Sequence, residues 1–138
     1  HYLEHLLDAT RFYPGVEAVL AHFADKKKGV VTNKPIEYTI KLIEGLGALE
    51  RFDVILGGNS TPYLKPHPAM VVAALEAVGV APDRAVMIGD NVNDIVAARA
   101  AGVRSVAVGY GLGDPSILRA ANPDFFCEQI QDVTELFS

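Results

Sequence analysis

Short apolar runs alternate with segments of helical periodicity along the whole chain, and Gly, Pro or Asn stands at most of the changes. The apolar runs show no alternation with polar residues, so both faces of each predicted strand are expected to be buried. Strands of this kind are typical of parallel sheets that helices cover on each side. The sequence therefore predicts an α/β fold built on a doubly wound parallel sheet.

The predicted elements follow one another as repeated βα units. The strands are the apolar runs 29–32, 53–56, 85–88, 104–108 and 124–126. The helices are predicted at 16–23, 35–45, 68–78, 92–101, after Asp114 and near 131–137. Because no internal repeat, low-complexity tract or linker interrupts this pattern, we predict a single domain over residues 1–138.

Charge and cysteine content exclude several classes of protein. The chain has 12 Lys and Arg against 17 Asp and Glu, a net charge of -5 at pH 7, and its one cationic run is 26–28. This balance argues against nucleic acid or an anionic membrane as a partner. No apolar stretch approaches the roughly 18 residues that a membrane-spanning helix needs. The single Cys127 cannot form an internal disulfide, which favours a reducing, cytoplasmic location.

Polar residues follow three of the predicted strands. Thr32, Asn33 and Lys34 come after the first, Lys65 stands in a Pro-rich loop before a helix, and a segment with two carboxylates, 89–94, follows the third. In open α/β sheets, ligands bind beyond the carboxyl ends of the strands. We therefore expect these residues to lie close together at one edge of the sheet.

The residue types suit a phosphoryl group and a small cation. Asp90 and Asp94 would present two carboxylates, and Mg²⁺ needs only one or two when water and phosphate supply the other ligands. Thr32 and the N–H groups at the next helix start would donate hydrogen bonds to phosphate oxygens, and Lys65 would neutralise their charge.

Each residue alone also has a purely structural interpretation. Asp90 could cap the following helix, and Asp94 could be an exposed first-turn carboxylate. Thr32 could simply be a β-former, Lys65 could be solvated, and Cys127 is expected to be a small core residue. The ordered combination of Thr, Lys and Asp at strand ends favours the phosphoryl site.

Three motifs carry a family resemblance. The runs Val-Thr-Asn-Lys-Pro (31–35), Lys-Pro-His-Pro (65–68) and Gly-Asp-Asn-Val-Asn-Asp (89–94) closely resemble the second, third and fourth motifs of the haloacid dehalogenase-like phosphohydrolases. The glycines at 57–58 and the Gly-Tyr-Gly run at 109–111 are similar to the phosphoglycolate phosphatase branch. The resemblance covers almost the whole chain and implies a Rossmann-like core domain.

The resemblance implies a role for each motif residue. Thr32 would hydrogen-bond the transferring phosphoryl group, with Asn33 assisting through its backbone or side chain. Lys65 would stabilise the charge on the phosphoryl oxygens and the nucleophile, Asp90 would bind Mg²⁺, and Asp94 would be a second metal-site carboxylate, direct or through water. The implied reaction is hydrolysis of a small phosphorylated metabolite, in which an aspartate attacks phosphorus and water then hydrolyses the acyl phosphate.

The chain departs from the family pattern near its start. The first motif, Asp-x-Asp closing an early strand, is absent, because the run Asp-Ala-Thr at 8–10 has neither the second aspartate nor a preceding apolar strand. The helical cap that this branch inserts between its first and second motifs is also missing, and the spacing of the later motifs leaves no room for a substitute cap. We therefore expect residues 1–138 to be the C-terminal portion of the core domain, inactive alone, with the nucleophile outside this chain.

The missing first strand is also a physical problem. In the family it is central, so its loss would leave two neighbours about 9–10 Å apart with unpaired backbone groups. The sheet would then have to close up, swap with a homodimer partner, or borrow a strand, for example from a missing N-terminal segment. A different hypothesis stays open: an inactive fragment, pseudoenzyme or interaction module that binds anion or metal without turnover.

Overall fold

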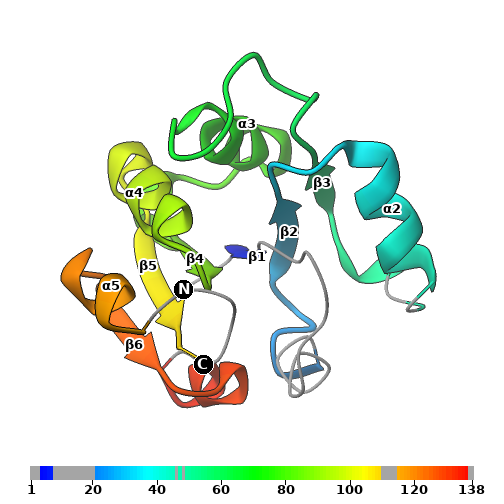
Figure 1. Ribbon diagram of the computed structural model, residues 1–138. Helices are drawn as coiled ribbons and strands as arrows, with labels where there is room; N and C mark the ends of the chain where they lie inside the picture. The colour runs from blue at the N-terminus through cyan, green and yellow to red at the C-terminus, as the bar shows by residue number, and fades with distance from the viewer. Residues whose placement is uncertain (1–3, 8–20, 46, 48, 110–114, 137–138) are drawn as a thin grey trace.

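Six parallel strands form one sheet in the order β3-β2-β1-β4-β5-β6 (Figure 1). The computed structural model describes residues 4–7, 21–45, 47, 49–109 and 115–136. The strands are β1 (Glu4–Leu7), β2 (Lys27–Val31), β3 (Val54–Leu56), β4 (Ala85–Gly89), β5 (Arg104–Val108) and β6 (Phe125–Cys127). The five predicted strands correspond to β2–β6, so the expected parallel sheet is confirmed.

Helices cover both faces of the sheet. They are α2 (Ile36–Gly45), α3 (Ala69–Val78), α4 (Val92–Ala101) and α5 (Pro115–Ala120), with short 3-10 helices at Leu49–Arg51, Pro82–Arg84 and Ile130–Glu135. The predicted helix over 16–23 falls mostly outside the described residues, as does Asp114. The last predicted helix is a 3-10 helix and not an α-helix. None of these helices has the length and apolar character that crossing a membrane requires.

The prediction of a gap at the centre of the sheet is wrong. Strand β1 lies between β2 and β4 and pairs with both in parallel register, for example Leu6 with Gly29 and with Met87. Its backbone therefore provides the hydrogen-bonding partners that a gap would deny to the two neighbours. The central strand is formed by the Glu-His-Leu-Leu run of this same chain, which the sequence pattern did not identify as a strand.

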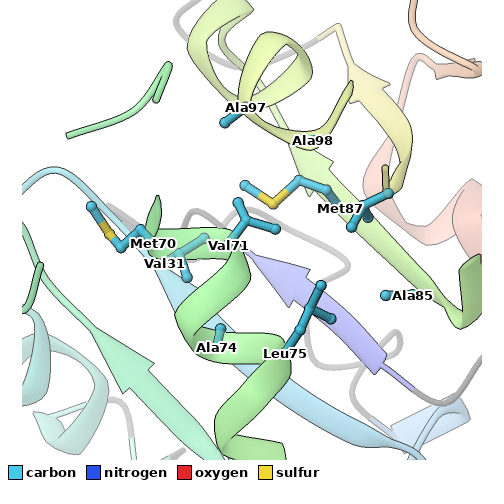
Figure 2. Packing of buried hydrophobic residues seen from close by; sticks show 10 residues of the cluster. Val31, Met70, Val71, Ala74, Leu75, Ala85, Met87, Ala97 and Ala98 are labelled. Atoms are coloured by element: carbon cyan, nitrogen blue, oxygen red, sulfur yellow. The ribbon is translucent and has the colours of Figure 1, made fainter. Parts of the chain in front are cut away.

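The core has two layers because successive strand residues point to opposite faces. Val30 packs in the layer that contains Phe23 and Ile43, whereas Val31 packs against α3 and α4. Figure 2 shows this second layer, where Met70, Val71, Ala74 and Leu75 of α3 meet Met87 of β4. Burial on both faces holds β2 and β4 rigidly, so the residues that follow these strands have fixed positions.

Candidate phosphoryl-binding site

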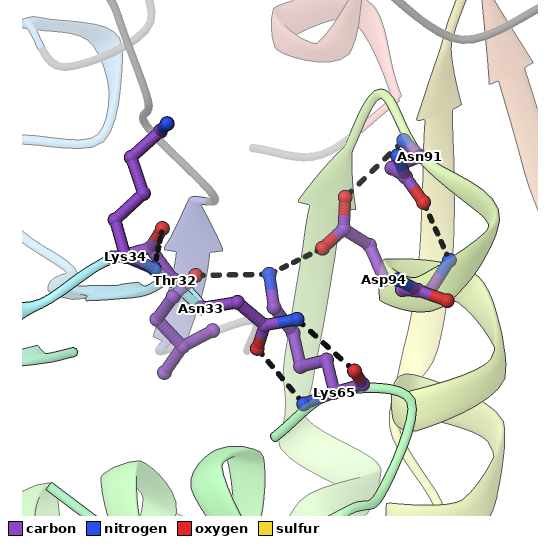
Figure 3. Close-up of polar contacts among 8 residues, drawn as sticks. Thr32, Asn33, Lys34, Lys65, Asn91 and Asp94 are labelled. Carbon is purple, nitrogen blue, oxygen red and sulfur yellow. Dashed lines mark hydrogen bonds and ion pairs between the residues drawn. The ribbon is translucent and has the colours of Figure 1, made fainter. Parts of the chain in front are cut away.

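Three segments far apart in the sequence meet at the carboxyl edge of the sheet (Figure 3). Thr32 directly follows β2, Lys65 lies in the loop between β3 and α3, and Asp94 lies in the first turn of α4. β2 and β4 flank β1, at the point where the strand order reverses, which is the usual ligand position in sheets of this kind. The predicted convergence of the Thr, Lys and Asp motifs is confirmed.

Lys65 and Asp94 form a buried ion pair. The Lys65 Nζ lies 2.5 Å from the Asp94 Oδ1, and each side chain is 1% exposed. The Lys65 ammonium also donates to the Val31 carbonyl at 3.1 Å. The interpretations of Lys65 as a solvated lysine and of Asp94 as an exposed carboxylate are therefore both wrong.

The second oxygen of Asp94 organises the start of α4. The Asn91 N–H donates to Asp94 Oδ2 at 3.2 Å, and the Asn91 side chain accepts from the Asn93 N–H at 2.9 Å. Asn91, and not Asp90, is therefore the N-cap. A Cβ at Gly89 would overlap the Asp94 carboxylate, so only glycine lets β4 pass this close.

The buried Thr32 hydroxyl accepts a hydrogen bond but donates none to the described residues. The residue is 1% exposed, and its Oγ1 accepts from the Lys34 N–H at 3.2 Å. Among the residues that the structure describes, neither the Thr32 hydroxyl proton nor the Asn33 main-chain N–H has an acceptor. A buried donor is costly to leave unsatisfied. The buried Thr32 hydroxyl therefore favours a hydrogen-bond acceptor such as a phosphate oxygen at this place, and the N–H of the partly buried Asn33 offers a second donor beside it.

The loop after β3 is tied to the start of α2. The Gly58 N–H donates to the Lys34 carbonyl at 2.6 Å, and the Asn59 side chain accepts from the Ile36 N–H at 3.0 Å. A Cβ at Gly58 would overlap the Asn33 carbonyl, so the glycine permits this close approach. The Gly-Gly pair at 57–58 was the sequence signal for this contact, but sequence reasoning used it only for the family resemblance.

The Asn33 side chain has a position that sequence reasoning did not foresee. Its Nδ2 donates to the Lys65 carbonyl at 3.0 Å, and its Oδ1 accepts from the Lys65 N–H at 2.9 Å. The carboxamide thus bonds to the backbone of the residue whose ammonium reaches Asp94. No spacing rule in the sequence indicates such a pairing across 32 residues.

The carboxylate of Asp90 follows β4 directly and is partly buried. The described part of the chain contains no group of three or more His, Cys, Asp or Glu side chains that could hold a metal ion. Asp90 and Asp94 therefore fit Mg²⁺ only in a site that water and phosphoryl oxygens complete, which is the shell that Mg²⁺ commonly retains. Their role as metal ligands stays a prediction.

The single cysteine lies away from these residues, in the core layer of β5 and β6. Cys127 is 6% exposed and packs in the cluster that includes Val108 and Val133. Burial raises the pKa of its thiol, and the charges of Asp132 and Glu135 raise it further. A raised pKa keeps the thiol protonated and weakly nucleophilic. The prediction that Cys127 is a core residue is confirmed.

Known proteins share both the sequence pattern and the fold. The family profile of the haloacid dehalogenase-like hydrolases matches residues 1–108. A phosphoglycolate phosphatase of Nitrosococcus oceani is 34% identical over 99% of this chain and 62% of its own length. That of Chromobacterium violaceum is 40% identical over 86% of this chain and 54% of its own length.

A solved structure gives the same result. The crystal structure of a predicted phosphoglycolate phosphatase from Haemophilus somnus superimposes with a TM-score of 0.85 and 32% identity, over 91% of this chain and 57% of that one. The chain thus spans little more than half the length of the relatives that it matches.

Proposed function

Because the chain belongs to the haloacid dehalogenase-like hydrolase family, we propose that the complete protein hydrolyses small phosphomonoesters at the carboxyl edge of this sheet. The observation that carries the proposal is the convergence of Thr32, Lys65 and Asp94 around a buried hydroxyl that lacks an acceptor among the described residues. This chain would supply the phosphate-binding and metal-binding side of the active site.

The phosphoryl group would be held by fixed donors. Thr32 would donate its hydroxyl proton, and Asn33 its main-chain N–H, to two phosphoryl oxygens. Lys65 would stabilise the charge that develops on these oxygens, and Asp94 would hold its ammonium in place. Donors that are already oriented need no reorganisation during the reaction, which is why such arrangements lower barriers effectively.

Magnesium is part of the proposal. Asp90 would hold the ion from the end of β4, with Asp94 as a second carboxylate, either directly or through water. When bound, Mg²⁺ would neutralise charge on the phosphoryl oxygens. Since Asp94 already pairs with Lys65, we favour contact between Asp94 and the ion through water.

The nucleophile is the part that the described residues do not supply. The family reaction uses an aspartate that attacks phosphorus, displaces the alcohol and forms an acyl phosphate that water then hydrolyses. In the family this aspartate follows the central strand. Strand β1 takes the central place here, but the run 8–10 that follows it lacks the second aspartate of the family motif and lies outside the described residues.

Phosphoglycolate is the substrate that we propose to test first. The relatives named above are called phosphoglycolate phosphatases, and this substrate carries a carboxylate besides its phosphoryl group. Lys34, two residues beyond Thr32, has an exposed side chain whose ammonium lies 5.6 Å from the centre of the Tyr38 ring. It forms no ion pair with any described carboxylate. This cation suits the carboxylate of such a substrate.

The experiment is release of inorganic phosphate from phosphoglycolate by the complete protein, with Mg²⁺ and with chelator. We expect release with Mg²⁺ only, and we expect the Lys65→Met variant to lose most of it. Binding of tungstate, a phosphate analogue, without any release would instead support the alternative of a binding module without turnover. If the complete protein neither releases phosphate nor binds tungstate, the proposed site is refuted.

A further inference from the structure

Asn33 joins the end of β2 to the loop that carries Lys65. Its carboxamide makes two hydrogen bonds to the backbone of this one residue, at 3.0 Å to the carbonyl and 2.9 Å from the N–H. A carboxamide is suited to this because it presents a donor and an acceptor side by side. Figure 3 shows the pair of bonds below the Lys65 ammonium.

Lys65 is thereby held at both ends. Asn33 fixes its main chain, while Asp94 and the Val31 carbonyl receive its ammonium. The segment around Lys65 has no regular secondary structure, so no strand or helix ladder holds its backbone. Since a lysine side chain has four rotatable carbon bonds, a displaced backbone would let the ammonium move away from the phosphoryl group.

We propose that Asn33 is a positioning residue for Lys65, and that its side chain does not bind the phosphoryl group. Both polar ends of the carboxamide already bond to Lys65, which fixes the orientation of the side chain, and we assign the contact with the substrate to the main-chain N–H of Asn33. This inference rests on the proposed function, because it assigns the placed ammonium to phosphoryl chemistry. The family resemblance implied that Asn33 assists phosphoryl binding through its backbone or its side chain, and the inference keeps only the backbone contact.

A matched control exists in the same junction. Asn59 also ties the loop after β3 to the start of α2, through bonds to the Ile36 N–H and to the Glu37 carboxylate, but it does not touch Lys65. Asn59→Ala would therefore loosen the same junction without releasing the Lys65 backbone. A difference between Asn33→Ala and Asn59→Ala reports on Lys65 and not on general loosening of the loop.

The test measures kcat and KM for phosphoglycolate, and the Kd for tungstate, in the complete protein. We expect Asn33→Ala to lower kcat by about 10- to 100-fold, as a displacement of about 1 Å does. We expect KM to change far less, because the ammonium acts mainly on charge that develops in the transition state. Tungstate affinity should fall as well, and Asn59→Ala should stay close to wild type in both measurements.

A double variant separates positioning from direct binding. In a Lys65→Met background, Asn33→Ala should cause no further loss of kcat or of tungstate affinity, since Asn33 acts through Lys65. If the losses caused by Lys65→Met and Asn33→Ala instead multiply in the double variant, Asn33 contacts the ligand itself. That result would overturn the positioning role of Asn33 but not the proposed function. An Asn33→Ala variant that behaves like wild type would do the same.

A wild-type protein that binds tungstate but releases no phosphate would refute the phosphatase proposal, and the tungstate comparison would still decide the role of Asn33. If the wild type binds no tungstate, both are wrong.

Discussion

The buried pair of Lys65 and Asp94 predicts a large and strongly coupled loss of stability. Each side chain is 1% exposed, so removing one charge leaves the other in a nearly water-free site. Asp94→Asn keeps an acceptor for the Asn91 N–H but removes the charge with which the Lys65 ammonium pairs at 2.5 Å. Breaking a buried pair in this way costs about 3–5 kcal/mol. This is a large part of the roughly 5–15 kcal/mol by which a domain is stable.

The double variant tests the reason for that loss. Lys65→Met alone should also cost about 3–5 kcal/mol, because it leaves a buried carboxylate. Lys65→Met with Asp94→Asn removes both charges, so its loss should be only about 1–3 kcal/mol, the cost of unsatisfied polar groups. The two effects should therefore be far from additive.

Urea unfolding followed by far-UV circular dichroism suits this chain, which has no tryptophan. The control is Asp25→Asn, which breaks the ion pair with Lys26 at 3.8 Å, where the Asp25 side chain is 77% exposed. We expect this variant to lose less than about 0.5 kcal/mol. The interpretation as a desolvated ion pair is refuted if the single variants at Lys65 and Asp94 lose no more unfolding free energy than the control. It is also refuted if the losses of the two single variants add up in the double variant.

Four further predictions concern the site and the core. Asp90→Asn should abolish Mg²⁺-dependent phosphate release with little change in the urea midpoint; unchanged release would exclude Asp90 as a ligand. Thr32→Val should weaken tungstate binding by about 10-fold, one charge-assisted hydrogen bond, and equal affinity would leave the hydroxyl without a role. Lys34→Met should raise KM for phosphoglycolate but not for ethyl phosphate, which lacks the carboxylate; equal changes would argue against recognition of that group. Because burial raises its pKa, the Cys127 thiol should react with iodoacetamide at pH 8 only after urea unfolding, and rapid native labelling would contradict its core position.

The strands and most helices were predictable because local pattern and burial agree. Successive residues of β2, β4 and β5 are buried on both faces of the sheet, and α3 places Val71, Ala74 and Leu75 on one buried stripe. The positions of Thr32 and Lys65 were predictable for a related reason. Parallel strands bring their carboxyl ends to one edge, so residues that follow different strands meet there.

The remaining features depend on partners far away in the sequence. β1 is the run Glu-His-Leu-Leu, in which two of the four residues are polar, so it gives no apolar run, and it is a strand because β2 and β4 pair with it. The Asn33 bonds likewise join residues that no local pattern connects. The pairing of Asp94 with Lys65 across 29 residues also lacks a local signal, since the sequence predicted Asp94 as a metal-site carboxylate or, alternatively, as an exposed one. The sequence near 131–137 likewise gave no signal that separates an α-helix from the 3-10 helix that the structure has there.

The position of a bound phosphate analogue is the most direct test of the phosphoryl site. Crystals of the complete protein soaked in tungstate would locate the ion from the anomalous signal of tungsten. We expect one peak within hydrogen-bonding distance of the Thr32 hydroxyl and the Lys65 ammonium. A peak only elsewhere, such as the cavity lined by Lys26, Lys28 and Arg51 at the other end of the sheet, would contradict the assignment of this site.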